Sequence, residues 1–394
     1  MHPRPQDHAS TPNLQPLSGI RVLDMSRVLA GPYCTMMLGD LGADVVKVES
    51  PEGDDTRRWG PPSQGGESAY YLCCNRNKRS IVLDLHTEEG QATARRLASR
   101  SQVLVENFRL GTMEKWGLGY EQLSADNPGL VYCSISGYGR TGPMSSLPGY
   151  DFVMQGAGGV MSFTGEPDGP PEKVGVAIVD LTAGLFALSA ILAALRVRDL
   201  TGMGQHIDIS LFDSHLAWLA NVGSNYLISG QVPPRYGNAH PNIVPYQAFP
   251  TGDGWLIVAV GTDRQWARLC DVLSRPDLAT DPRFATNSAR VEHRTTLVPL
   301  LEAAFNGRTT AEWLALLEAA DVPAGPVNNV AQALDHPQAA ARDMVQEVPH
   351  PGIGPVRMVA SPLKLSHTPP AIRRHPPMLG EHTEEVLEEL RRDE

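Results

Sequence analysis

The sequence predicts an α/β fold with two domains, the larger of them built on a parallel, Rossmann-like sheet. Short β-branched runs alternate with helical patterns in the N-terminal half, starting with a strand at 19–24, a helix at 32–41 and a strand at 44–49. Strands joined through a helix in this way run parallel. After about residue 225 the pattern changes to a hairpin followed by helices, which indicates a smaller α+β domain.

The remaining elements follow from periodicity and turn residues. Further strands are expected at 79–85, 102–106, 130–136 and 205–210, with helices at 88–99 and 211–229. The second domain should hold a hairpin at 246–249 and 255–260, helices at 263–274, 286–305 and 310–320, a turn at 351–354 and a last helix at 381–392. We therefore expect a disordered tail (1–16), a large domain (17–225), a small domain (226–330) and a C-terminal return to the large domain (331–394).

Composition narrows the classes of partner and compartment. The 394 residues carry a net charge of −11, which argues against nucleic acid and acidic membranes as partners. Five cysteines without a C-x-x-C pair are typical of the reducing cytoplasm. The polar segment 1–16 lacks the apolar core of a signal peptide, and the apolar run 183–195 is too short to span a bilayer. An anionic ligand would need a local basic patch, for which the first 150 residues supply Arg27, Lys47, Arg57, Arg58, Arg76, Lys78, Arg79, Arg109, Lys115 and Arg140.

Several familiar motifs are missing. The turn after the first strand has one glycine instead of G-x-G-x-x-G, which argues against a simple NAD or FAD site. The Gly156–Gly159 segment lacks the Lys-Ser/Thr of a phosphate-binding loop. There is no G-x-S-x-G, and the histidines lack metal-ligand spacing. We expect neither a metal nor a cofactor beyond the substrates.

Asp180 is the central candidate for chemistry. Residues 172–179 are rich in β-branched side chains and predict a strand that ends at Asp180. The leucine spacing that follows predicts a buried helix. The N-terminus of a helix favours an ionised carboxylate, which suits a nucleophile. The same position also suits an N-cap that contributes only about 1 kcal/mol, and both interpretations stay open at this point.

Ordered segments along nearly the whole chain, from Leu17 onward, resolve that choice. They are Leu23-Asp24 with 28–32, then 38–49, 77–80, 105–108, 137–143, 201–205 and 379–383. In this order they resemble the class III CoA-transferases, the family of formyl-CoA and carnitine-CoA transferases. The resemblance implies that Asp180 is the catalytic aspartate. It also implies a Rossmann-like large domain, a small domain and two chains interlocked as a homodimer.

The resemblance also implies a set of binding residues. CoA contacts fall at Val28, Ala30, Leu83, His86, Asn107, Phe108 and Lys115, and Arg140 is a further candidate for CoA or for the acid. Candidates for binding the acid substrate are Arg76, Arg79, Tyr150 and His240. Acyl-CoA, a free carboxylic acid and a second copy of the chain are therefore the expected partners.

Within the family, the chain looks most like members that act on dicarboxylates. The segments that carry this likeness are 59–62, 70–72, 239–240 and 243–249. We expect succinyl-CoA as the donor and itaconate or a related C5 acid as the acceptor. The resemblance implies that the acyl group and then CoA are held on Asp180, as an anhydride and a thioester.

Two alternatives remain. The α-methylacyl-CoA racemases resemble the chain but need a histidine immediately before the aspartate that corresponds to Asp151. Here that residue is Tyr150, whose phenol, with a pKa of about 10, is a poor carrier for an α-proton. The other alternative is a CoA-binding protein without catalysis, against which the retained Asp180 argues.

Overall fold

The computed structural model describes residues 14–392, and this part of the chain forms two compact units. The first unit contains the described residues up to Gly158, Gly175–Trp218 and those from Pro337 onward, and the second contains Gly159–Val174 and Leu219–His336. The segment 159–174 thus belongs with the smaller unit, whereas the sequence placed it in the large domain. Residues 1–13 of the expected tail lie outside the described residues.

A six-stranded parallel sheet forms the centre of the first unit, which confirms the predicted fold class. The strand order is β5-β2-β1-β6-β7-β8, and every neighbouring pair is parallel. The strands are β1 (Arg21–Asp24), β2 (Asp44–Glu49), β5 (Lys78–Val82), β6 (Val103–Glu106), β7 (Val131–Ser136) and β8 (His206–Ser210). Two small antiparallel pairs, β3 (Ser63–Gln64) with β4 (Glu67–Ser68) and β12 (Val345–Val348) with β13 (Val356–Val359), complete the strands of this unit.

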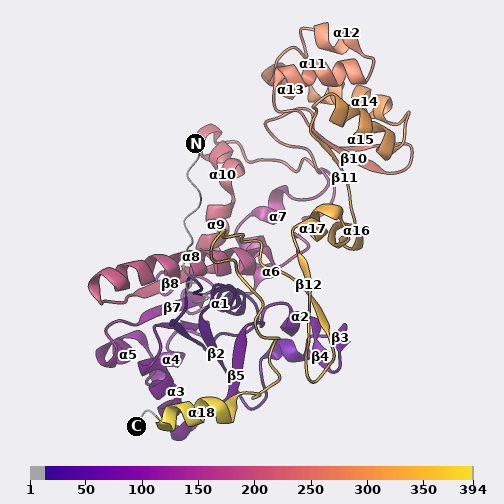
Figure 1. Ribbon diagram of the computed structural model, residues 1–394. Helices are drawn as coiled ribbons and strands as arrows, with labels where there is room; N and C mark the ends of the chain where they lie inside the picture. The colour runs from indigo at the N-terminus through magenta and orange to yellow at the C-terminus, as the bar shows by residue number, and fades with distance from the viewer. Residues whose placement is uncertain (1–13, 393–394) are drawn as a thin grey trace, which may run out of the picture. The chain divides into compact units, whose positions relative to one another are not determined.

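Helices cover both faces of the sheet (Figure 1). On one face lie α1 (Ala30–Asp40) and α8 (Ile178–Thr201); on the other lie α3 (Glu88–Ser99), α4 (Thr112–Lys115), α5 (Tyr120–Asp126) and α18 (Thr383–Arg392). The unit also contains η1 (Asp55–Arg58), α2 (Ala69–Leu72), α6 (Asp151–Ala157), α9 (Leu211–Trp218) and α17 (Pro337–Ala341). A separate apolar core therefore lies on each face, so the sheet itself is buried on both sides.

Several buried charges at the carboxyl ends of the strands are paired. Asp24, fully buried at the end of β1, accepts a hydrogen bond from Lys78 Nζ at 2.9 Å. Burial opposes its ionisation, but Lys78 and Lys47 outweigh that effect and lower the pKa of Asp24 to about 2. Lys47 in turn pairs with Asp54 at 3.0 Å. These pairs fix the loops that follow β1 and β2, because an unpaired charge here would cost several kcal/mol, on the order of 3–5.

The predicted strand at 172–179 is wrong. Residues 172–179 form no strand; α8 already begins at Ile178, and the sheet position beside β7 belongs to β8. The β-branched residues of this segment favour a strand locally. That preference loses to a tertiary contact, because the Asp151 carboxylate binds the main-chain N–H groups of Val179 and Asp180 and so starts a helix.

Helix α8 is longer than its apolar run suggested. Its 24 residues make it long and apolar enough, by length and composition alone, to cross a membrane, and half of its most apolar window is buried inside the protein. The helix is therefore longer than the apolar run 183–195 from which the sequence analysis judged its length. Val179, Ala183 and Ile191 of this helix lie in the apolar core shared with α1, as expected for the central helix of a folded unit.

The second unit is a small α+β body. Its antiparallel sheet has the order β11-β10-β9, with β9 (Tyr246–Pro250), β10 (Trp255–Ala259) and β11 (Ala324–Pro326). Its helices are α7 (Val160–Phe163), α10 (Ala220–Ser229), α11 (Asp263–Val272), α12 (Pro276–Thr280), α13 (Asn287–Glu292), α14 (Arg294–Phe305), α15 (Thr310–Ala319) and α16 (Val330–Leu334). The predicted hairpin at 246–260 is confirmed, and the helix expected over 211–229 breaks at Leu219 into α9 and α10.

Candidate active site

Asp180 lies in the first turn of α8, held by a second carboxylate. Asp151 Oδ2 accepts hydrogen bonds from Val179 N at 2.7 Å and from Asp180 N at 3.3 Å. Asp151 Oδ1 accepts another from Gln155 Nε2 at 2.7 Å, which fixes its orientation. Asp151, and not Asp180, therefore caps this helix. The Asp180 side chain is left available for chemistry.

The pKa of Asp180 differs from the expectation for a helix N-terminus. Burial, followed by the nearby negative charge of Asp151, raises it to about 7, whereas the sequence predicted an easily ionised carboxylate. Desolvation and like charge thus outweigh the helix dipole. Burial, followed by the charge of Asp180, also raises the pKa of the Tyr70 phenol.

Close packing brings Asp180 next to the loop between β1 and α1. Gly184, one turn after Asp180, lies against this loop, and a Cβ at that position would come within 2.7 Å of the Ala30 carbonyl oxygen. In the loop itself Val28 has φ of 70°, a conformation that β-branched residues rarely adopt. Asp54 accepts a hydrogen bond from Val28 N at 3.3 Å, so the surrounding structure holds this strained residue in place.

Asp180 borders a cavity of about 270 Å³ within the first unit. Among the residues predicted to bind substrates, this cavity includes Val28, Ala30, Asn107, Phe108 and Tyr150. The other lining residues are Arg27, Leu29, Arg109, Leu110, Ile135, Ser136, Gly137, Ser145, Ser146, Leu147, Pro148, Gly149 and Leu211. The carboxyl ends of the parallel strands supply most of these segments, which is where ligands bind in open α/β sheets.

A larger cavity of about 610 Å³ adjoins the first one. It includes the predicted CoA contacts Leu83 and His86. Both cavities are lined by Arg27, Phe108 and Arg109, so these three residues form a shared wall. The two cavities therefore lie on either side of this wall, and the Asp180 carboxyl group borders the smaller one.

Two predicted residues lie near this path but outside both linings. Lys115 is exposed at the end of α4. Arg140 pairs with Glu114, and its main-chain N–H donates to Asp208 at 3.0 Å. The charge of Arg140 is thus already balanced by a neighbour on the protein.

The structure places the two predicted arginines of the acid site elsewhere. Arg76 is buried and forms a bidentate pair with Asp40, at 2.9 and 2.7 Å. Arg79 is buried as well, and it pairs with Asp44, Glu385 and Glu389. Both guanidinium groups face carboxylates of the protein and line neither of these two cavities.

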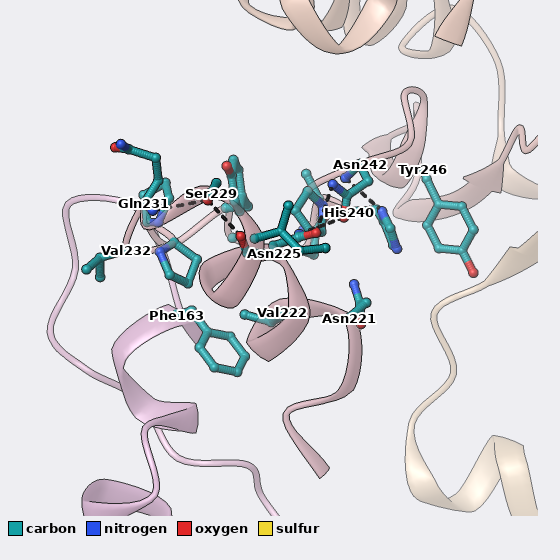
Figure 2. A pocket seen from close by; sticks show the side chains of 18 residues that line it. Phe163, Asn221, Val222, Asn225, Ser229, Gln231, Val232, His240, Asn242 and Tyr246 are labelled. Carbon is teal, nitrogen blue, oxygen red and sulfur yellow. Dashed lines mark hydrogen bonds between the residues drawn. The ribbon is translucent and has the colours of Figure 1, made fainter. Parts of the chain in front are cut away.

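His240 belongs to the second unit, where it lines a separate cavity of about 620 Å³ (Figure 2). Figure 2 shows His240 beside Asn242 and Tyr246, with the Asn225 amide joined to Asn242. His240 Nδ1 accepts a hydrogen bond from Asn242 N at 3.0 Å, which leaves Nε2 as a donor in the neutral ring. Burial and Arg294 lower the pKa of His240, so the neutral form is favoured.

Sequence reasoning missed four residues of the site. Asp151 was noted only as a landmark, because a capping partner from a distant loop leaves no local signal. Tyr70 was quoted only as part of a resembling segment. Arg27 and Arg109 stood in a list of basic residues without a role. Their position after the carboxyl ends of β1 and β6 was the signal that could have singled them out.

Comparisons with known proteins agree with this geometry. Residues 17–383 match the model of CoA-transferase family III. The chain belongs to this family. A succinate–glutarate CoA-transferase of Agrobacterium fabrum is 49% identical over 382 residues, which cover 95% of this chain and 96% of the relative. The human succinyl-CoA:glutarate CoA-transferase is 43% identical over 99% of this chain and 89% of its own length. The crystal structure of a CAIB/BAIF family protein from Brucella suis superposes with a TM-score of 0.85 at 48% identity, covering 95% of this chain and 99% of that one.

The raised pKa of Asp180 predicts an acid limb in the rate of this CoA-transferase. Only the carboxylate form is nucleophilic, so kcat/KM should fall about tenfold per pH unit below about 7. Replacing Asp151 by Asn removes the negative charge that helps to raise this pKa, so the midpoint should move to lower pH. The measurement is kcat/KM between pH 5 and 9. Tyr150→Phe, which changes no charge in the cavity, is the control and should keep the midpoint; an unchanged midpoint in Asp151→Asn would contradict the assignment.

Proposed function

We propose that the protein transfers CoA from succinyl-CoA to a free C5 dicarboxylate, with glutarate as the favoured acceptor. The observation that carries this proposal is the carboxyl group of Asp180 at the border of a cavity that shares three lining residues with a second, larger cavity. The family membership and two relatives that are named for succinate and glutarate support it. The sequence alone favoured itaconate; the names of these relatives shift our proposal to the saturated acid.

The proposed reaction uses Asp180 twice. Its carboxylate attacks the succinyl thioester carbonyl, a C–O bond forms, the C–S bond breaks, and CoA leaves as a thiolate. The thiolate then attacks the Asp180 carbonyl of this anhydride, which releases succinate and leaves an aspartyl-CoA thioester. The acceptor carboxylate attacks that thioester and expels the thiolate. Finally the thiolate attacks the new acyl carbonyl, which gives the product acyl-CoA and restores Asp180.

Residues around Asp180 give the proposed reaction steps electrostatic and structural support. The Tyr70 phenol is protonated at neutral pH, since even its ordinary pKa is about 10, and burial and the charge of Asp180 raise the pKa further; we propose that it donates a hydrogen bond to charge that develops next to Asp180. Asp151 keeps the first turn of α8 in place through two main-chain hydrogen bonds. The thioester's free energy is retained in each intermediate, so the scheme needs no ATP.

We place CoA along the two cavities. The nucleotide end occupies the larger one, next to Leu83 and His86, and the pantetheine passes the shared wall of Arg27, Phe108 and Arg109 to reach Asp180. The second carboxylate of a dicarboxylate needs a cation or several donors when water is displaced. Arg27 and Arg109 are the arginines that line the Asp180 cavity, and Ser145 and Ser146 add hydroxyl donors.

We also propose that the working protein is a homodimer. Helix α8 exposes several large apolar side chains, among them Phe186 (41%) and Leu200 (66%). In the second unit, Leu227 and Ile228 of α10 are 81% and 87% exposed. Apolar side chains this large and this exposed on long helices are typical of surfaces covered by another chain. The occupant we propose is a second copy, as the resemblance to this family implied.

Asp180→Asn should abolish transfer while CoA still binds. Removing the nucleophile leaves no atom to carry the acyl group, so kcat should fall by roughly a thousandfold or more. The measurement combines transfer rates with calorimetric binding of CoA, and with mass spectrometry of wild-type protein incubated with succinyl-CoA. A mass increase on the peptide that contains Asp180 is expected. Near-normal turnover in Asp180→Asn would contradict the proposal.

A panel of free acids tests the acceptor and separates the alternatives. With succinyl-CoA as donor, glutarate should give the highest kcat/KM, itaconate less, and propionate, which lacks a second carboxylate, at least about tenfold less than glutarate because one charge-assisted contact is lost. Loss of succinyl-CoA and formation of the new acyl-CoA are followed by chromatography. Exchange of an α-proton in deuterium oxide without any acceptor would instead indicate a racemase.

The oligomeric state has a direct test. Light scattering of the purified chain should give twice the chain mass of 42.6 kDa. Replacing both Leu227 and Ile228 by Glu should reduce the dimer fraction, because two charges would be buried in an apolar contact. The matched control replaces the neighbouring exposed Ser229 by Glu. A monomeric wild-type protein at micromolar concentration would refute the proposal.

A further inference from the structure

Glu106 is a buried carboxyl group that the reaction scheme does not use. It is the last residue of β6, and its exposed fraction is only 2%. Within residues 14–392 its oxygens have no ion-pair partner, because the nearby Arg140 pairs with Glu114 instead. Burying a carboxyl group without a countercharge is costly. We therefore expect the hydrogen bonds of Glu106 to have a role that an apolar side chain could not fill.

The hydrogen bonds of Glu106 identify that task. Oε2 accepts from Phe108 N at 2.8 Å, two residues further along the chain, which closes a tight turn directly after β6. The hydroxyl of Ser134, on the neighbouring strand β7, also bonds to Glu106 and lies 2.9 Å from His206 Nε2. The carboxyl group is thus anchored to the sheet on one side and holds the turn on the other. Burial raises its pKa to about 7, and the hydrogen bonds oppose this rise.

The turn held by Glu106 is the wall shared by both cavities. Phe108 and Arg109 line the two of them, and Asn107 lies between Glu106 and this wall. The Asn107 side chain accepts from Arg27 N at 2.9 Å and donates to Arg27 O at 2.7 Å. The Phe108 ring packs edge-on against Trp116, at 5.1 Å between ring centroids, and beneath the Arg27 guanidinium. A displaced Phe108 main chain would therefore move both sides of the passage.

We propose that Glu106 is a positioning residue that sets the affinity for CoA by holding the Phe108 main chain at the junction of the two cavities. This inference rests on the proposed path of CoA through them. Glu106 touches no substrate, so it should act on the binding of the CoA portion, which is the same in every acyl-CoA. The property that matters is the length of the Glu106 side chain, which lets its carboxyl group accept from Phe108 N, and not its charge.

Two substitutions at Glu106 distinguish the effect of side-chain length from the effect of charge. Glu106→Gln keeps the length and an oxygen that accepts from Phe108 N, and its amide can still bond to Ser134. Glu106→Asp keeps the charge but is one methylene shorter, so it cannot span the same turn. We expect Glu106→Asp to raise the KM for succinyl-CoA and the Kd for free CoA at least tenfold, with kcat changed less than threefold, and Glu106→Gln to stay within threefold of wild type in all three constants.

The measurements are steady-state kinetics, calorimetric titration of free CoA and thermal unfolding of each variant. The matched control is Glu89→Asp, the same shortening at an exposed position on α3, which should leave both constants unchanged. Equal losses in the Gln and Asp variants, or wild-type CoA affinity in Glu106→Asp, would overturn the inference.

The two proposals fail separately in this design. If wild-type protein binds CoA but transfers none to dicarboxylates, the proposed acceptor class is wrong, and the Kd values for CoA still test Glu106. If transfer to dicarboxylates occurs and Glu106→Asp matches wild type in KM and Kd, only the role of Glu106 is refuted.

Discussion

The hydrogen bonds from Asp151 to the first turn of α8 determine how the site is built. They start the helix two residues before Asp180 and so fix the main chain that carries its carboxyl group. The same carboxylate adds negative charge next to Asp180, and together with burial this raises the pKa of Asp180 to the middle of the physiological range. One side chain therefore sets both the position and the reactivity of another.

The parallel sheet explains why a site of this kind forms here. The loops after β1 and β6 start at adjacent strand ends. Arg27 therefore bonds to Asn107 and lies next to Phe108, although 80 residues separate Arg27 from Asn107 in the sequence. Buried ion pairs such as that between Lys78 and Asp24 keep these strand ends in register with their loops. The buried sheet and the paired loops together hold the residues around Asp180 in a fixed geometry.

Local patterns predicted the sheet well and the site less well. Strands such as 44–49 and helices such as 88–99 were found with the observed bounds, because β-branched runs and capped amphipathic turns are local signals. The segment 172–179 failed because a distant carboxylate overrides its strand preference. The binding residues of the first loop and of 107–108 came from resemblance and do line the cavities around Asp180. Arg76 and Arg79 were misplaced because a sequence does not reveal that a basic cluster is already neutralised by Asp40 and Asp44.

The wall formed by Arg27, Phe108 and Arg109 has a consequence for how this scaffold diversifies. Residues 145–149 border only the smaller cavity, whereas Leu83 and His86 border only the larger one. In the proposed arrangement, substitutions in 145–149 would therefore change which acid is accepted and leave the residues around the CoA nucleotide unchanged. Separate binding sites for CoA and for the acid would let a single fold serve transferases that act on many different acids.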